Sequence, residues 1–168
     1  IFPEHLNDDS FITLTFAKNL SSGNGFVYNH PPEVLGTTTP LFTLLVATIH
    51  GLFPSSNLPE VAVLISALCW LGIGWLFIAF RNAWGITGWQ AAVIGIVINF
   101  SPWVFSLGME AYVFAFFLVL SLSCFWSKRY FVAGLSAGLL HLVRGEGILI
   151  AGILGVLLLV RFLSRKGV

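Results

Sequence analysis

A few charged residues of this chain have the types and spacing that chemistry needs. Asp8 and Asp9 are adjacent in a polar opening segment. One carboxylate could take a proton from a hydroxyl group while its neighbour orients a substrate or a metal ion. The same pair suits the start of a helix, because a carboxylate caps free N–H groups and interacts favourably with the helix dipole. Both interpretations stay open on the sequence alone.

Glu110, Arg144 and Glu146 interrupt strongly apolar sequence. A carboxylate at the mouth of an apolar helix is costly unless it is paired or faces a polar cavity, so Glu110 is a candidate site residue. The alternative is an ordinary acid at a helix start. Arg144 could hold a lipid phosphate by forked hydrogen bonds, or it could form only a local ion pair with Glu146. His141 precedes Arg144 at helical spacing and joins the substrate-binding candidates.

The composition indicates a membrane protein. Hydrophobic residues make up 57% of the chain and charged residues only 9%, against about 25% charged in an ordinary soluble domain. The net charge of +1 gives no reason to expect a nucleic-acid partner. Cys69 and Cys124 lie inside apolar runs and are interpreted as packing residues. The chain contains no phosphate-binding loop or dinucleotide fingerprint.

Several apolar runs approach the roughly 20 residues that cross a bilayer. They cover residues 58–80, 86–104, 109–126, 130–142 and 147–162, and the fourth is short. We therefore expect an all-α fold, a polytopic transmembrane helical bundle of about five spans over residues 58–168. Residues 1–57 are expected to form a first outer loop.

The opening loop should contain helices of its own. Asn7 to Ser10 is typical of a helix start, and residues 11–20 would place Ile12, Phe16 and Leu20 on one face of a helix in the membrane interface. The serine- and glycine-rich residues 21–25 should end that helix.

Residues 37–53 could either cross the membrane or dip in and return. The positive-inside rule favours the second choice, because only then do Arg81, the basic pair at 128–129 and the basic residues of 161–166 lie on the side opposite the acidic opening loop. The opening loop, Glu110 and residues 141–146 would then face outward. Tryptophans at positions 84, 89 and 126 would mark the opposite interface.

The order of these motifs resembles a known enzyme family. The relevant residues are 8–14, 17–20, 23–29 and 36–41, followed by Gly108-Met109-Glu110 and the segment 144–147. Together they resemble the first outer loop and later segments of bacterial GT-C glycosyltransferases. These enzymes use polyprenyl- or dolichyl-phosphate sugars and are related to protein mannosyltransferases and lipid A aminoarabinose transferases. The chain departs from many relatives, which have Arg-Pro-Asp-Gly or Thr-Lys-Pro where it has Arg-Gly-Glu-Gly.

The resemblance implies site residues and a cofactor question. Asp8 or Asp9 would be the catalytic base and Glu110 the second-loop acid, while Lys18 lies in a matching run and is included among the substrate-binding candidates. Some relatives use a divalent ion and others do not. If a metal is used, Asp8, Asp9 and Glu110 offer hard oxygen ligands that suit Mg²⁺ or Mn²⁺. As a member of this family, the chain would be an incomplete GT-C module.

The sequence therefore predicts an inverting membrane glycosyltransferase. Its partners would be membrane lipids and a lipid-phosphate sugar donor, and its acceptor is left open. It would lie in a bacterial inner (cytoplasmic) membrane with its site facing the periplasm. Two other functions stay open: a transporter or flippase component, in which Glu110, Arg144 and Glu146 would line an ion or proton pathway, and a noncatalytic membrane scaffold.

Overall fold

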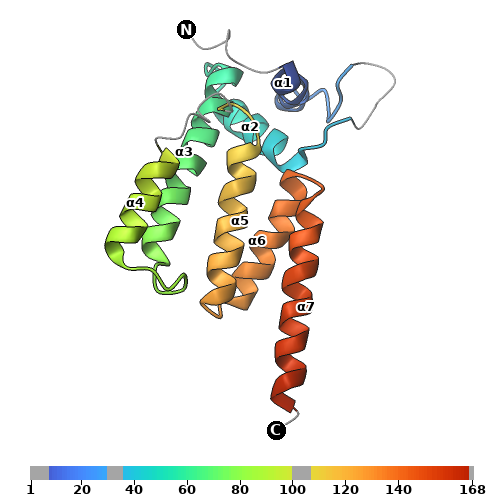
Figure 1. Cartoon of the computed structure of the whole chain (residues 1–168). Coiled ribbons are helices and arrows are strands. Elements are labelled where there is room, and N and C mark those ends of the chain that lie inside the picture. The colour runs from blue at the N-terminus through green and yellow to red at the C-terminus, as the bar shows by residue number, and fades with distance from the viewer. Residues whose placement is uncertain (1–7, 30–35, 100–106, 167–168) are drawn as a thin grey trace.

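The computed structural model describes residues 8–29, 36–99 and 107–166. Within these ranges the chain is all-α, as expected, with seven helices and no strand. The helices are α1 (Asp8–Ser21), α2 (Pro40–Leu52), α3 (Leu58–Ala79), α4 (Gly88–Asn99), α5 (Ala111–Trp126), α6 (Tyr130–Val143) and α7 (Gly147–Lys166). Helices α3 to α7 run alongside one another, and α1 and α2 lie across one end of them (Figure 1).

Turn chemistry ends α1 where the sequence predicts it. The N–H of Asn24 donates to the carbonyl of Asn19 at 2.9 Å, and the N–H of Gly23 donates to that of Leu20 at 3.1 Å. This pair of bonds is the Schellman motif, which needs a residue in the left-handed region just past the helix. Gly23 supplies it with a φ of +79°.

The apolar side chains predicted to share one face of α1 differ in burial. Phe16 is buried, whereas Ile12 is 43% exposed. The face turned toward α2 instead carries Thr13, whose hydroxyl lies 3.3 Å from that of Thr39. A hydrogen bond between two buried side chains therefore fixes the rotation of α1, and hydrophobicity alone would have placed Ile12 there.

Helix α2 stays at the end of the bundle. It begins at Pro40, which suits the first helical turn because proline has no N–H to leave unpaired. Its 13 residues span about 20 Å, less than the roughly 30 Å of a hydrocarbon core. One face, including Phe42, Val46 and Ala47, is buried against α1, α3 and α6.

Two helices, α3 and α7, are long and apolar enough to cross a membrane by length and composition. The expected bounds of α3 and α6 agree with the observed ones to within a residue, whereas the expected span over 86–104 continues past Asn99 into residues outside the described ranges. Helices α4, α5 and α6 have 12, 16 and 14 residues. That all five helices are membrane spans stays a prediction.

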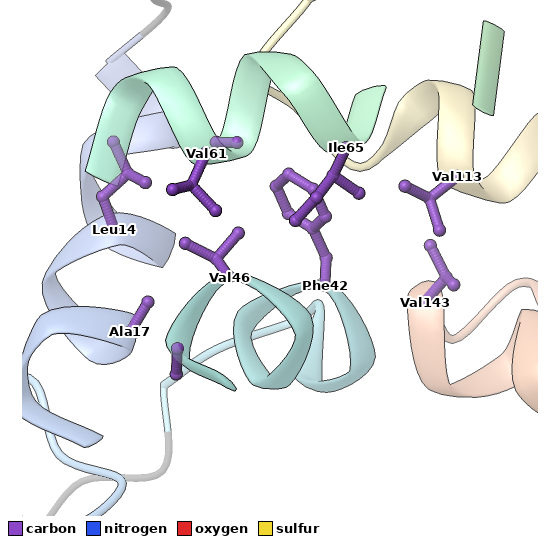
Figure 2. Packing of buried hydrophobic residues seen from close by; sticks show 10 residues of the cluster. Leu14, Ala17, Phe42, Val46, Val61, Ile65, Val113 and Val143 are labelled. Atoms are coloured by element: carbon purple, nitrogen blue, oxygen red, sulfur yellow. The ribbon is translucent and has the colours of Figure 1, made fainter. Parts of the chain in front are cut away.

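Two apolar clusters hold the helices together. Figure 2 shows the first, in which side chains of α1, α2, α3, α5 and α6 meet. The second joins the far ends of α5, α6 and the middle of α7, around Cys124, Phe125 and Leu154. Both cysteines are free thiols and Cys124 is buried in this cluster, in agreement with their interpretation as packing residues. The first cluster lies directly under the polar residues described next.

Candidate functional site

Arg144 lies between two carboxylates at the end of the bundle where α1 and α2 pack. Its Nη1 donates to Oε1 of Glu110 at 3.2 Å. Its Nε and Nη2 donate to the two carboxylate oxygens of Glu146 at 3.4 and 3.5 Å. The local ion pair between Arg144 and Glu146 is therefore present, and it extends to an acid 34 positions earlier in the chain. The solvent-exposed fraction of the side chain rises from 10% for Glu110 to 45% for Arg144 and 62% for Glu146.

A serine of α3 positions Glu110. The fully buried Ser66 Oγ accepts a hydrogen bond from the N–H of Gly108 at 3.2 Å and lies 2.9 Å from the carbonyl oxygen of Met109. Gly108 has a φ of +90°, a left-handed conformation that a residue with a side chain rarely adopts. The chain is thus held against α3 immediately before Glu110, which forms the N-cap position of α5.

A tight turn between α6 and α7 positions Arg144 and Glu146. The N–H of Gly147 donates to the carbonyl of Arg144 at 2.9 Å. A Cβ at Gly147 would lie 2.5 Å from both the nitrogen of His141 and the carbonyl carbon of Leu140, so only glycine fits there. His141 Nδ1 lies 3.2 Å from the carbonyl oxygen of Gly145, which can only accept, so this ring nitrogen carries the proton.

Threonine hydroxyls form the opposite wall. Thr37 lies 3.2 Å from the hydroxyl of Thr43 and 3.5 Å from that of Thr39. Thr39 in turn contacts Thr13 of α1, and both Thr39 and Thr43 are buried. Sequence reasoning did not count these threonines as site residues. The signal was present in the Gly36-Thr37-Thr38-Thr39-Pro40 run, which places several hydroxyl groups directly before a helix start.

Two cavities meet at Arg144 and Thr38. The first has a volume of about 290 Å³ and is lined by Ile12, Thr13, Gly36, Thr37, Thr38, Thr39, Met109, Glu110 and Arg144. The second, of about 410 Å³, is lined by Thr38, Arg144, Gly145 and Glu146. Since Glu146 borders only the second cavity, its side chain lies on the outer side of Arg144 and that of Glu110 on the inner side.

The other predicted residues are placed as follows. Asp8 and Asp9 form the first turn of α1, so their backbone lies one turn before Ile12 and Thr13 of the first cavity, while their side chains lie outside the described part of the structure. Lys18 is exposed in the last turn of α1 and lines neither cavity. His141 is exposed and lines neither cavity, although it braces the turn that carries Arg144 and Glu146.

No group of three or more histidine, cysteine, aspartate or glutamate side chains able to hold a metal ion occurs among the described residues. Glu110, one of the three proposed metal ligands, already bonds to Arg144. Because the side chains of Asp8 and Asp9 are not described, the Mg²⁺ or Mn²⁺ site stays a prediction.

Charge is unevenly shared within the site. Glu110, Arg144 and Glu146 carry one positive and two negative charges, so the cluster has a net charge of −1. A hydrogen bond from its own backbone N–H, together with the hydrogen bond and charge of Arg144, holds the pKa of Glu146 below its ordinary value. Glu146 is therefore ionised at neutral pH while remaining mostly in solvent. The arrangement is a cation with hydroxyl groups on one side and an exposed counter-charge on the other.

A scan of protein-family models found no match to the chain, and searches of curated proteins and of solved structures found none either. Over the described residues, the chain is an all-α protein with two helices long and apolar enough to cross a membrane and with a polar site at one end.

Proposed function

We propose that the chain belongs to a membrane glycosyltransferase that moves a sugar from a polyprenyl- or dolichyl-phosphate donor to an acceptor hydroxyl at the outer membrane face. The observation that carries this proposal is the cavity between the first turns of α1, the threonine run and the Glu110–Arg144 pair. Such a donor keeps its isoprenoid tail in the bilayer, so its phosphate must bind where apolar helices border polar groups. This cavity lies between apolar helices and polar side chains.

The distribution of charge supports the orientation. The acids whose side chains are described, Glu60, Glu110 and Glu146, lie at the start of α3, the start of α5 and the turn before α7. These points share the end of the bundle that α1 and α2 cover (Figure 1). The basic residues Arg81, Lys128, Arg129 and Arg161 lie at or near the opposite ends of these helices. By the positive-inside rule the site would face the periplasm of a bacterial inner membrane.

Arg144 is the residue proposed to bind the donor phosphate. An arginine has five N–H donors, and three of them reach Glu110 or Glu146. The bonds to Glu146 are long, and their acceptor is the more exposed carboxylate. A phosphate fits the same two-pronged edge of a guanidinium as a carboxylate does. The donor would therefore displace Glu146 and leave Glu110 in place, with the exposed Thr38 offering a hydroxyl that lines both cavities.

The proposed reaction is a single inverting displacement. Asp8 or Asp9 takes the proton of the acceptor hydroxyl, whose oxygen forms a bond to the anomeric carbon of the sugar. The bond from that carbon to the phosphate oxygen breaks, and its electron pair leaves with the lipid phosphate. Negative charge grows on the phosphate as the bond breaks, so the cation of Arg144 stabilises the transition state more than the ground state.

The alternative as a transporter or flippase is less well supported. A transport pathway usually places charged groups near the middle of the membrane on interrupted helices. In α3 to α7, each charged side chain that the structure describes lies in a first turn, in the last two turns or in a connecting turn. A noncatalytic scaffold gives no reason for Glu110 to be kept almost out of solvent beside a cavity.

The test is sugar transfer from radiolabelled polyprenyl-phosphate sugars in membranes that carry the full-length protein. Asp8→Asn and Asp9→Asn are compared with wild type at equal protein levels. We expect the variant that removes the base to lose activity by about 10²- to 10⁴-fold. Glu60→Gln is the matched control, because Glu60 is an exposed acid at the same end of the bundle that lines neither cavity.

The outcomes separate the hypotheses. If wild type transfers sugar and both aspartate variants keep full activity, the proposed base is wrong. If no donor gives transfer, the transferase proposal itself fails, and the transporter and scaffold alternatives gain weight. A loss in Glu60→Gln as large as in the aspartate variants would indicate that any negative charge at this end matters, which contradicts a specific base.

A further inference from the structure

Basic residues at the end of the bundle away from the candidate site have no acidic partners among the described residues. Among the described residues, the only cation in an ion pair is Arg144, which lies in the candidate site at the other end. Two arginines stack on aromatic rings instead. The guanidinium carbon of Arg129 lies 5.6 Å from the ring centre of Phe80, and that of Arg161 lies 5.4 Å from the ring centre of Phe125. Phe80 and Phe125 both belong to the second apolar cluster.

Arg161 also borders a cavity between the start of α6 and the last turns of α7. Its volume is about 280 Å³, and its walls are Tyr130, Leu158, Arg161 and Phe162. Nη1 of Arg161 donates to the hydroxyl oxygen of Tyr130 at 3.3 Å. The guanidinium is therefore oriented from two sides, by this bond and by the face of Phe125. One cation fixed against apolar walls is suited to a ligand that is both anionic and amphipathic.

The surroundings of the cavity favour a lipid as that ligand. Beyond the cavity, α7 exposes large apolar side chains, among them Val156 at 61%, Leu159 at 57% and Leu163 at 59%. Water would be a poor solvent for this surface, whereas acyl chains would cover it. The basic end is also the end that the positive-inside rule assigns to the cytoplasmic leaflet, where anionic lipids attract basic residues.

We propose that this cavity binds the head group of an anionic phospholipid, with the lipid phosphate on Arg161 and the acyl chains along the exposed face of α7. The remaining N–H groups of Arg161 supply donors for the phosphate, and Leu158 and Phe162 flank the glycerol region. This inference rests on the membrane placement of the proposed function and is independent of sugar transfer.

The experiment uses the full-length protein in nanodiscs made of equal parts phosphatidylcholine and phosphatidylglycerol. Native mass spectrometry then measures the ratio of the two lipids that stay bound after the disc is removed. Wild type should retain phosphatidylglycerol in preference, and Arg161→Gln should lower the ratio by about fivefold, the effect expected for one basic side chain next to an anionic lipid. Arg161→Lys keeps the charge without the planar, stacked group and should give an intermediate ratio.

Arg81→Gln is the matched control, because it removes the same charge from an exposed position at the same end but outside the cavity. We expect it to change the ratio by less than about twofold. Circular dichroism of each variant checks that the helices remain formed. An excess of soluble glycerophosphate should leave the bound lipid in place, since it lacks acyl chains to contact α7.

Five results would overturn the proposal. Equal losses in Arg161→Gln and Arg81→Gln would indicate diffuse surface charge without a site. Equal retention of the two lipids by wild type, or a lipid ratio that Arg161→Gln does not change, would contradict a lipid site. A protein partner would then be the alternative occupant of this face. Displacement by glycerophosphate would identify the phosphate group alone as the ligand. Failure to enter nanodiscs would remove the membrane placement and the lipid site together, whereas a normal entry with no lipid preference removes only the site.

Discussion

Replacing Ser66 by alanine should loosen the segment that carries Glu110. The hydroxyl of Ser66 is fully buried and accepts the N–H of Gly108 at 3.2 Å, across 42 positions of the chain. Alanine would leave that buried N–H without its partner, which costs about 1–3 kcal/mol. The loss should raise the local opening equilibrium of this segment by about 5- to 150-fold. The measurement is the hydrogen-exchange rate of the Gly108 amide.

Ser121→Ala provides the control for this prediction. Ser121 is just as fully buried, but its hydroxyl donates only to the carbonyl of Leu118 in the same helix, at 2.9 Å. Its removal should leave exchange at Gly108 within about twofold of wild type, because no tertiary bond is lost. Equal exchange rates in the two variants would refute the reasoning that Ser66 holds the start of α5. A faster rate in Ser66→Ala alone, with lower transfer activity, would identify Ser66 as a positioning residue for Glu110.

Three further changes test the turn before α7. Gly147→Ala should destabilise the packing of α6 against α7 by about 1–3 kcal/mol or more, because the new Cβ would meet the backbone of Leu140. Denaturant unfolding measures this loss. Gly145→Ala is the control, because a Cβ at position 145 would meet open space. The pKa of Glu146 is lowered in the folded protein. The contribution of Glu146 to folding stability is therefore complete above the ordinary glutamate pKa, roughly 4.3, and is lost as pH falls through the lower folded pKa. Glu146→Gln should abolish this loss in acid titrations of stability. If Glu146 occupies the phosphate edge of Arg144, Glu146→Gln should lower the donor KM in transfer assays, and an unchanged or higher KM would contradict the displacement.

The helices could be predicted well because local signals determine them. The acidic start of α1 and the glycine-rich stop after it each act within a few residues, and the structure places helix ends there. The rotation of α1 could not be predicted in the same way. It depends on a hydrogen bond between the hydroxyls of Thr13 and Thr39, and the packing of α2 sets the position of Thr39.

The candidate site was predicted in parts. Glu110 was interpreted either as a carboxylate that is paired or faces a cavity, or as an ordinary acid at a helix start; it is the N-cap of α5, pairs with Arg144 and borders a cavity. The identity of its partner could not be read from the sequence, because 34 residues separate it from Arg144 and a tertiary contact brings them together. Lys18 was included because it lies in a matching run, yet it is solvent-exposed and lines neither cavity.

The apolar core explains why Glu110 and Arg144 can meet. Val113 follows Glu110 by one helical turn and Val143 immediately precedes Arg144, and both valines are completely buried in the same cluster (Figure 2). Packing of α5 against α6 therefore fixes the two backbones before any charge is considered. A buried carboxylate would be costly without a partner, so the cation at 144 satisfies a requirement that the core itself creates. Glu146 has no such requirement, because it stands in solvent. Of the two acids on Arg144, it is therefore the one that an incoming phosphate can replace at the smaller cost.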